Sequence, residues 1–548
     1  MKFFATAVLV ILISSALYFP FIGNVHLFDW DEINFAEIAR EMLESGVYLN
    51  AQIDYQTFTE KPPLFMWLQA CSMHIFGINE FAARFPNAFL GVVVSIFFLW
   101  WGKKHYSIQF GLIWVIVWWS TFLPHLYFKS GIIDPWFNFF IFISLLSIIS
   151  HYHQYKKGEN TYRSLLLAGV FTGFAILTKG PVSLLIISLV VFVYWIIEKF
   201  KWYLPFWHFL IYLFTSLFTF GIWLVIDYML HGPGFIIEFT IRQWELLTTP
   251  DAGHRGFFGY HIVVLLLGCL PASAFFVGEL LERSKRTRVN RYISDYKRWM
   301  TILFFVVLVL FSLVKTKIVH YSSLAYYPLT FIAALYTYSV TKNKFKISKT
   351  SRIIYYFQIF LMLVISITLV VFFNIKDEVQ KLIEDQFAKE NLMADTVQWI
   401  WLDFWPVVLA VLLLIFARRF FNSSELKYFY SFAFLHILWI QITLYAHIGN
   451  IERISQRSNI EFFKSLKDED AYITTFNYKS YAHLFYAESK NQENPKRHDP
   501  TWLQTGKIDK PVYFSVRKYH VKEFENRVTD AEFMYSKNGF YFYIRRPD

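Results

Sequence analysis

Two clusters of charged side chains lie close together near the start of the sequence. Asp31-Glu32 follows an apolar segment that runs from Phe3 to about Phe21, and Glu60-Lys61 comes shortly before the next long apolar run. A carboxylate suits general-base work on a hydroxyl acceptor. A lysine suits a phosphate, because its point charge stabilises a leaving anion. An acid and a cation in one loop beside apolar segments therefore indicate group transfer from a lipid phosphate.

Further candidates stand at the ends of later apolar segments. They are Asp134, Lys179, and the pair Lys315 and Lys317, which precede His320-Tyr321. Ionisable groups at membrane depth are costly, so their presence there indicates function. The alternative for the lysines is that they only extend from a helix end toward the membrane surface.

A later loop contributes Arg242 and His254. Arg242 is a second candidate for binding an anionic ligand. A single histidine is usually only a polar surface residue. His254 with one glutamate from another loop would make a sparse metal site, which substrate oxygens or water would have to complete.

The composition is that of a membrane protein. Of the 548 residues, 56% are hydrophobic and 17% are charged, whereas about 25% of a soluble domain is charged. The net charge of +11 could suggest nucleic acid. However, the basic residues stand in short loops between apolar runs, which favours anchoring on the cytoplasmic side. We therefore expect no nucleic-acid partner.

The hydrophobic pattern predicts an all-α polytopic membrane protein. A helix needs about 20 apolar residues to cross the hydrocarbon. About thirteen segments approach this length, near residues 3–22, 81–101, 108–127, 135–150, 164–178, 182–198, 205–226, 261–280, 299–314, 321–341, 353–373, 403–418 and 428–446. Residues 1–448 are thus predicted to form a membrane domain and residues 449–548 a soluble one.

The distribution of lysine and arginine predicts the orientation. With the N-terminus in the cytoplasm, Lys103-Lys104, Lys156-Lys157 and Arg418-Arg419 fall in cytoplasmic loops, as the positive-inside rule requires. The outer side then holds a first loop, residues 23–80, a second loop, residues 227–260, and the C-terminal tail. Long outer loops and short inner ones predict an active site that faces outward.

Two outer regions have predicted secondary structure. Residues 32–44 have the amphipathic spacing of a helix that lies along the membrane surface. In the tail, strand-like runs occur at residues 471–476, 511–516, 532–535 and 541–545. Lys537-Asn538-Gly539 joins the last two runs and is typical of a hairpin. A small α/β or α+β domain is expected. The sequence has no G-x-x-x-x-G-K-[ST] or G-x-G-x-x-G motif, so no nucleotide cofactor is expected.

In their order along the chain, these motifs resemble those of the GT-C type membrane glycosyltransferases. The branch is that of the lipid A aminoarabinose transferases and protein O-mannosyltransferases. The matching motifs are Asp31-Glu32, Glu60-Lys61-Pro62, Asp134-Pro135, Lys179-Gly180, Glu238 with Arg242 and His254, and Lys315-Thr316-Lys317 with Tyr321 and Pro328. Each motif alone is weak, but six in the same order are specific.

The resemblance implies an inverting transfer of a sugar from a polyprenyl-phosphate donor to a glycolipid or protein acceptor. Asp31 would be the general base, and Lys61, with Lys317 and Arg242, would bind the donor phosphate. Glu60 and His254 resemble a pair that binds a divalent metal in relatives, which would be Zn, Mg or Mn. The residues expected to support the site are Glu32, Asp134, Lys179, Lys315 and Tyr321.

The expected location is a bacterial inner membrane, with membrane lipids around the helices and with the active site and C-terminal domain in the periplasm. The sequence departs from the aminoarabinose transferases at Asn34, where they have Arg, and at Ile318-Val319, where they have Leu-Pro. The sugar is therefore unassigned. The alternatives are a polyprenyl-lipid transporter or flippase, and a non-catalytic subunit of a glycosylation complex. A transporter should place its ionisable groups near the membrane midplane.

Overall fold

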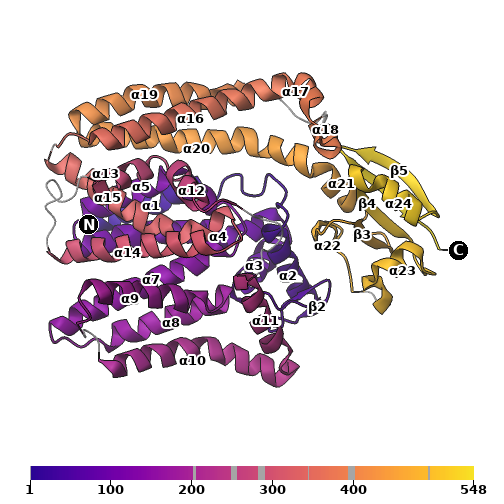
Figure 1. Ribbon diagram of the computed structural model, residues 1–548, viewed down its shortest axis with the longest axis horizontal. Coiled ribbons are helices and arrows are strands. Elements are labelled where there is room, and N and C mark those ends of the chain that lie inside the picture. The colour runs from indigo at the N-terminus through magenta and orange to yellow at the C-terminus, as the bar shows by residue number, and fades with distance from the viewer. Residues whose placement is uncertain are drawn as a thin grey trace.

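The helices form one long bundle, and a mixed α/β domain lies at one end of it (Figure 1). The computed structural model describes residues 2–201, 205–248, 256–281, 291–343, 345–392, 401–491 and 494–547. The predicted fold class, an all-α polytopic membrane protein with a small C-terminal domain, is confirmed. The last bundle helix continues past the predicted domain boundary at residue 448 and ends at Ser455.

Seven helices of the described residues are long and apolar enough to cross a membrane. They are α4 (Glu80–His105), α7 (Asp134–Lys156), α10 (Phe206–His231), α14 (Arg291–Leu313), α16 (Lys349–Asn374), α19 (Trp405–Ser423) and α20 (Leu426–Ser455). A further apolar pair, α12 (Tyr260–Gly268) and α13 (Ala272–Leu281), has axes that differ by 113° and forms either a broken eighth span or a re-entrant loop. Pro271 follows the first half of this pair and ends it, because proline cannot continue the backbone hydrogen bonds.

The five other predicted spans lie on helices of 12 to 18 residues. These are α1 (Lys2–Tyr18), α5 (Ile108–Trp119), α8 (Tyr162–Lys179), α9 (Val182–Ile197) and α15 (Tyr326–Asn343). Each is shorter than the roughly 20 residues that a straight crossing needs. All thirteen predicted segments are thus helical, but fewer of them meet the length of a full span.

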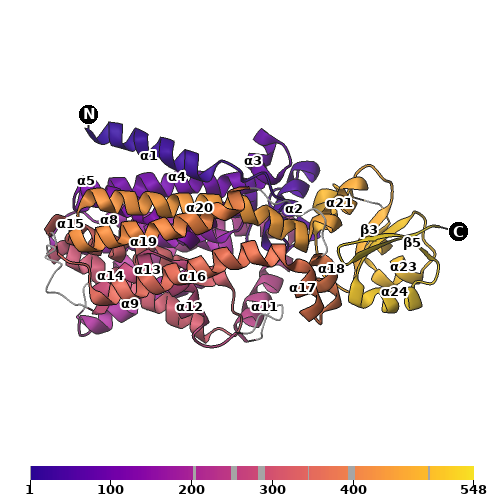
Figure 2. The same cartoon turned by 90° about the horizontal axis from the view of Figure 1, so that it is seen from above.

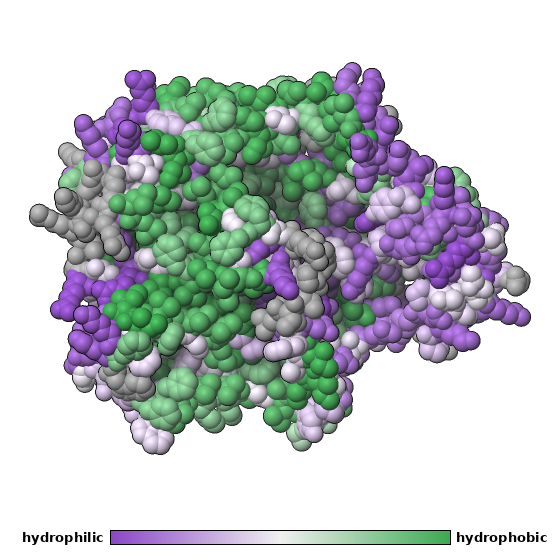
Figure 3. Space-filling model, viewed as in Figure 1, coloured by the Kyte–Doolittle hydropathy of each residue, from purple (hydrophilic) through white to green (hydrophobic). Residues whose placement is uncertain are grey.

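The surface of the bundle is apolar between two polar ends (Figure 3). The helix α10 shows this best, because only 17% of its most apolar stretch is buried inside the protein. Exposed side chains on it include Trp207, Phe214 and Met229. Large apolar surfaces of this kind are stable only against lipid or another protein.

Short elements gather at the end of the bundle next to the C-terminal domain (Figures 1 and 2). The first outer loop contributes α2 (Asp31–Ser45), a hairpin of β1 (Gln52–Ile53) and β2 (Gln56–Thr57), and α3 (Leu64–Phe76). The remaining short elements of the membrane domain are α6 (Phe122–Tyr127), α11 (Gly234–Thr248), η1 (Val319–Ala325), α17 (Lys376–Leu382), α18 (Gln386–Leu392) and η2 (Trp401–Phe404).

The C-terminal domain is built on a four-stranded sheet in the order β3-β4-β6-β5. The strands are β3 (Tyr472–Phe476), β4 (Val512–Arg517), β5 (Ala531–Lys537) and β6 (Phe540–Arg545). The first two are parallel and the other pairs antiparallel. All four predicted strands are present, and Asn538 and Gly539 turn the hairpin with positive φ angles of 51° and 78°, as a tight hairpin turn requires.

Short helices surround the sheet and connect it to α20. They are α21 (Arg457–Ser465), α22 (Ala482–Tyr486), η3 (Pro495–His498), α23 (Pro500–Thr505), η4 (Lys518–His520) and α24 (Val521–Arg527). One apolar core joins this domain to the first outer loop, because Phe35 of α2 and Phe65 of α3 share it with Phe463 and Phe542. The C-terminal domain is therefore packed against the loop that carries Asp31.

The predicted helix over residues 32–44 is present as α2, but its charged side does not face water. Glu37, Arg40 and Glu41 are all buried. Arg40 forms hydrogen bonds of 2.6 and 2.7 Å with Glu37 and donates to the main-chain oxygen of Ser489 in the C-terminal domain. The amphipathic pattern therefore reflects burial against this domain, which the sequence pattern alone does not distinguish from a membrane-surface helix.

A second set of contacts fixes the tip of the hairpin. The Glu41 carboxylate accepts hydrogen bonds from the N–H groups of Asp54 and Tyr55. Burial, together with the nearby charge of Glu37, raises the pKa of Glu41 to about 9. Arg497 and His498 of the C-terminal domain pair with the Asp54 carboxylate at 3.2 and 2.9 Å.

One buried ion pair holds the start of α2 against α4. Arg84 Nε and Nη2 donate to the two carboxylate oxygens of Glu32 at 2.9 and 2.7 Å. The same carboxylate accepts from the N–H groups of Phe28 and Gly131. Burial alone would raise the pKa of Glu32, but Arg84 and these two N–H donors hold it below its ordinary value.

We predict that Glu32→Gln destabilises the whole protein. The change leaves the buried Arg84 without an opposing charge, and loss of one partner of a buried pair costs about 3–5 kcal/mol. Thermal unfolding of the purified protein in detergent measures the effect. Glu80→Gln is the matched control, because Glu80 pairs only loosely with Lys464, at 3.6 Å, and such pairs contribute about 0–1 kcal/mol. Equal melting temperatures for wild type and Glu32→Gln would contradict the structural role.

Candidate active site

The ends of several elements bring the predicted residues to one end of the bundle. Asp31 is the first residue of α2 and Asp134 the first of α7, while Lys179 is the last of α8. The loop before Asp134 is fixed by Asn87 of α4, which donates to the carbonyls of Ser130 and Ile132 at 2.7 Å. Charged side chains at these ends can face an aqueous cavity while the helices remain in lipid.

The two aspartates have different surroundings. Asp134 is 4% exposed, and one of its oxygens accepts a 2.6 Å hydrogen bond from Lys179 Nζ. Asp31 is 40% exposed. A general base must reach its substrate, so the exposed Asp31 suits that task. Asp134 suits a structural one, because it binds Lys179 in place.

His320 lies between these two carboxylates. Its Nε2 atom is 3.4 Å from Asp31 Oδ2 and 3.8 Å from Asp134 Oδ2. The next residue, Tyr321, places its ring 5.3 Å from Lys179 Nζ. The sequence pattern includes His320 in the Lys-x-Lys segment but gives it no role. Its position beside Tyr321 near a predicted helix end was the only signal that could have identified it.

Lys61 is the partly buried cation of the site. Its Nζ donates to the main-chain oxygen of Glu60 at 3.2 Å. Loss of hydration lowers the pKa of Lys61, and the positive charges of Lys179 and Arg242 lower it further, against the opposing charges of Glu60 and Asp31. These influences mean that Asp31 and Lys61 share one cluster of charges. A cation kept apart from carboxylates is suited to an anionic ligand.

Arg242 extends the cluster from α11. Its Nη2 atom is 3.7 Å from Glu60 Oε1 and its Nη1 atom is 3.4 Å from Glu245. The guanidinium is therefore beside the Glu60-Lys61 motif, as a second phosphate ligand would have to be. Asp31, Lys61, Lys179 and Arg242 are brought together by four different elements or loops.

Lys317 differs from its predicted role. Its ammonium group donates to the main-chain oxygens of Phe311, Ser312 and Val314 at 3.0, 2.6 and 2.5 Å. A lysine has three N–H donors, so these carbonyls at the end of α14 use all of them. Lys317 caps the helix, and its charge is favourable there.

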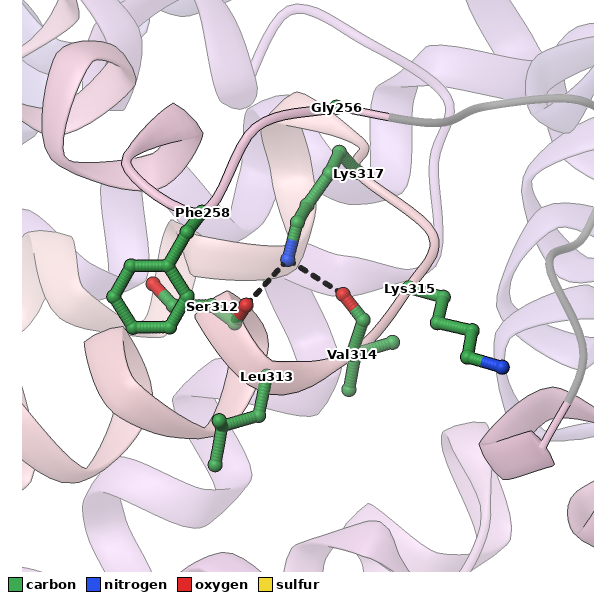
Figure 4. A pocket seen from close by; sticks show the side chains of 7 residues that line it. All are labelled: Gly256, Phe258, Ser312, Leu313, Val314, Lys315 and Lys317. Carbon is green, nitrogen blue, oxygen red and sulfur yellow. Dashed lines mark hydrogen bonds between the residues drawn. The ribbon is translucent and has the colours of Figure 1, made fainter.

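A cavity of about 510 Å³ adjoins this cap and is lined by Gly256, Phe258, Leu313 and Lys315 among others (Figure 4). Lys317 points toward the end of α14, whereas the exposed Lys315 extends away from it. The two lysines of the Lys-x-Lys segment therefore do not act as one phosphate clamp. Glu32, the other residue predicted to support the site, acts through the ion pair with Arg84.

The predicted metal pair is only partly within the described structure, because His254 lies outside the described residues. Among the residues that the structure describes, no three His, Cys, Asp or Glu side chains gather into a possible metal site. The described partner of Glu60 is Arg242. The described residues alone do not make a complete metal site, so the metal pair of Glu60 and His254 stays a prediction.

Comparisons with known proteins match the predicted resemblance. The family profile described as dolichyl-phosphate-mannose-protein mannosyltransferase matches residues 60–228. The undecaprenyl phosphate-alpha-4-amino-4-deoxy-L-arabinose arabinosyl transferase of Edwardsiella ictaluri is 25% identical over 337 residues, covering 59% of this chain and 58% of that protein. The protein of the same name from Shewanella sediminis is 26% identical over 355 residues, with 64% and 62% covered. These matches span about three fifths of the relatives' length.

The fold comparison covers almost the whole chain. The crystal structure of ArnT from Cupriavidus metallidurans bound to undecaprenyl phosphate has a TM-score of 0.73 at 17% identity, covering 99% of this chain and 97% of that one. The chain therefore has the GT-C fold of a polytopic membrane protein. The family profile, the relatives and this fold are all similar to the ArnT-like GT-C type membrane glycosyltransferases that the motifs resemble.

We predict that Lys317→Met lowers stability. Hydrogen bonds to charged groups contribute about 1.5–3 kcal/mol, and the substitution removes all three from the end of α14. The melting temperature in detergent should fall clearly below that of wild type. Lys315→Met is the matched control, since its exposed side chain is two residues away, and it should unfold at the wild-type temperature. Identical stability of the two variants would show that Lys317 is not a helix cap.

Proposed function

We propose that the protein transfers a sugar, with inversion, from a polyprenyl-phosphate donor to a glycolipid or protein acceptor at the outer face of a bacterial inner membrane. The observation that carries this proposal is the shared cluster of the exposed Asp31 carboxylate and the partly buried Lys61 ammonium. A base and a phosphate-binding cation in one site are what a transfer from a sugar phosphate needs.

The chemistry is a single displacement. The acceptor oxygen attacks the anomeric carbon while its proton passes to the Asp31 carboxylate. The bond between that carbon and the phosphate oxygen breaks, and its electron pair leaves with the polyprenyl phosphate. Lys61 and Arg242 stabilise the charge that develops on the leaving phosphate, which lowers the barrier because that charge is greatest late in the reaction.

The names of the relatives support the choice of substrates. The curated transferases are named for undecaprenyl phosphate and an aminoarabinose, and the solved ArnT structure contains undecaprenyl phosphate. A polyprenyl-phosphate donor and a lipid A-like acceptor follow by similarity. The surrounding membrane lipids would deliver both, because each carries its own hydrocarbon chains.

The ends of the helices support a periplasmic site. The helices α4 and α7 begin at the charged cluster and end at Lys103-Lys104 and at Lys156. Basic ends of this kind face the cytoplasm. The cluster and the C-terminal domain would then face the periplasm. Asp134 and Lys179 stand at helix ends and not near the midplane, which favours group transfer over the transport alternative.

We predict that Asp31→Asn abolishes transfer and preserves donor binding. The amide cannot accept the acceptor's proton, and loss of a general base costs about 10²- to 10⁴-fold in rate. Mass spectrometry of envelope glycolipids and glycoproteins, from cells with and without the protein, identifies the missing sugar mass. Wild type should restore that mass. Asp31→Asn should not restore it, although purified Asp31→Asn should bind undecaprenyl phosphate as wild type does.

Asp468→Asn, which changes an exposed aspartate of the C-terminal domain, is the control and should restore the sugar mass. A non-catalytic subunit would tolerate Asp31→Asn. Restoration by Asp31→Asn would therefore end the proposal that this protein performs the chemistry.

We predict that binding of undecaprenyl phosphate weakens as pH rises. The loss of affinity should begin at a lower pH than it would if Lys61 had the pKa of an ordinary lysine. The phosphate binds the charged form of Lys61, and the pKa of Lys61 is below its ordinary value, which is about 10.4. Affinity should fall as pH rises through that lowered pKa. Titrations above about pH 8, where a phosphate monoester is fully ionised, isolate this effect.

Lys61→Arg is the matched variant, because arginine stays charged in this range. Its affinity should be independent of pH where that of wild type declines. If the affinity of wild type falls only at the pH where a free lysine loses its proton, the assignment of Lys61 as the phosphate ligand is contradicted.

A further inference from the structure

The position of His320 is fixed by several elements of the bundle. Its main-chain oxygen accepts a hydrogen bond from Ser323 Oγ. Asn138 of α7 donates to Ser323 Oγ at 2.8 Å, and Ser323 in turn contacts the hydroxyl of Tyr127 on α6. The imidazole ring packs edge-on against the ring of Tyr321. These contacts hold the main chain of His320 between α6, α7 and η1, and Tyr321 packs against its ring.

One nitrogen of this ring faces two carboxylates. Nε2 is 3.4 Å from Asp31 Oδ2 and 3.8 Å from Asp134 Oδ2. Lys179 already occupies the other oxygen of Asp134. Asp134 Oδ2 is buried and has no hydrogen-bond partner among the described residues, so its negative charge acts on the imidazole nitrogen across 3.8 Å. One further charged group lies near these carboxylates: Lys61, whose charge interacts with those of Asp31 and Lys179.

We propose that His320 is a positioning residue for Asp31, which it anchors to the buried pair Asp134–Lys179. This inference rests on the proposed function. The Nε2–H group directs one oxygen of the Asp31 carboxylate toward the protein interior and leaves the other oxygen for the acceptor hydroxyl. Asp134, which Lys179 binds in place, puts a second carboxylate beside the same nitrogen and so favours a proton on Nε2.

His320 does not itself exchange a proton with the acceptor in this arrangement. The acceptor proton moves to Asp31, and the N–H of His320 stays on its nitrogen. The contribution of His320 is orientation and a favourable interaction with the ionised carboxylate. A displacement of about 1 Å at a reacting group can cost about a hundredfold in rate, so loss of this anchor should lower kcat and leave donor binding unchanged.

The test compares His320→Ala with His320→Gln, because the amide nitrogen of glutamine can replace Nε2–H as a donor. Purified full-length variants are added to membranes from cells that lack the protein, and acceptor modification is followed by mass spectrometry. We expect kcat to fall about tenfold to a hundredfold in His320→Ala and clearly less in His320→Gln. The inhibition constant of added undecaprenyl phosphate should stay within about twofold of wild type, since the Lys61 side of the site is unchanged.

The pH profile separates positioning from simple loss of structure. A hydrogen-bond donor favours the ionised form of a carboxylate, so the acidic limb of the rate profile should move to higher pH in His320→Ala and return toward wild type in His320→Gln. His520→Ala, in the C-terminal domain, should match wild type in rate and profile. Melting temperatures in detergent identify any variant that has lost its fold.

Three outcomes would overturn the inference. One is a His320→Ala variant with the rate and profile of wild type, and another is equal loss in both His320 variants with no shift of the acidic limb. The third is a His320→Gln variant as inactive as Asp31→Asn, which would make His320 the base itself. If wild type modifies no acceptor, the proposed function fails and this inference fails with it. If wild type modifies one and His320→Ala equals it, only this inference fails.

Discussion

A carboxylate and a guanidinium, both shielded from water, hold the start of α2 to the start of α4. Glu32 also accepts hydrogen bonds from the N–H groups of Phe28 and Gly131, so a single side chain fixes three segments. Asp31 precedes it in sequence, and Asp134 lies three residues beyond Gly131. The charges of the active site are therefore positioned by a neighbour that takes no part in the chemistry. The two neighbouring acids therefore have different roles: Glu32 binds Arg84, and Asp31 is the exposed carboxylate of the site.

The C-terminal domain also helps to position the first outer loop. It shares an apolar core with α2 and α3, and Arg497 and His498 hold the tip of the hairpin between Asp31 and Lys61. An interface that is both apolar and charged positions the first outer loop more firmly than the loop's own short elements could. The C-terminal domain therefore supports the first outer loop, which carries Asp31 and Lys61.

The distribution of charge in the site follows from burial. The buried carboxylates of Asp134 and Glu32 are paired with Lys179 and Arg84, because an unpaired buried charge is costly. Asp31 remains accessible, and Lys61 is enclosed without an ion pair to the described residues. The proposed base, Asp31, and the proposed phosphate ligand Lys61 are thus the two groups that differ from these buried pairs.

The sequence by itself determined the class of fold, the helical segments and the strands of the C-terminal domain, and it marked Asp31, Lys61 and Arg242 as candidates for the site. The length and periodicity of apolar segments are local properties, and the order of the motifs can be read directly from the sequence. The tertiary structure alone decided which charges meet. Lys317 looks like a phosphate ligand in its motif, but the fold brings the carbonyls of α14 to it. The charged side of α2 looks solvated, but the C-terminal domain covers it. His320 became a member of the site only because η1, α2 and α7 begin at the same place. Side-chain partners depend on residues far away in the chain, and no local pattern specifies them.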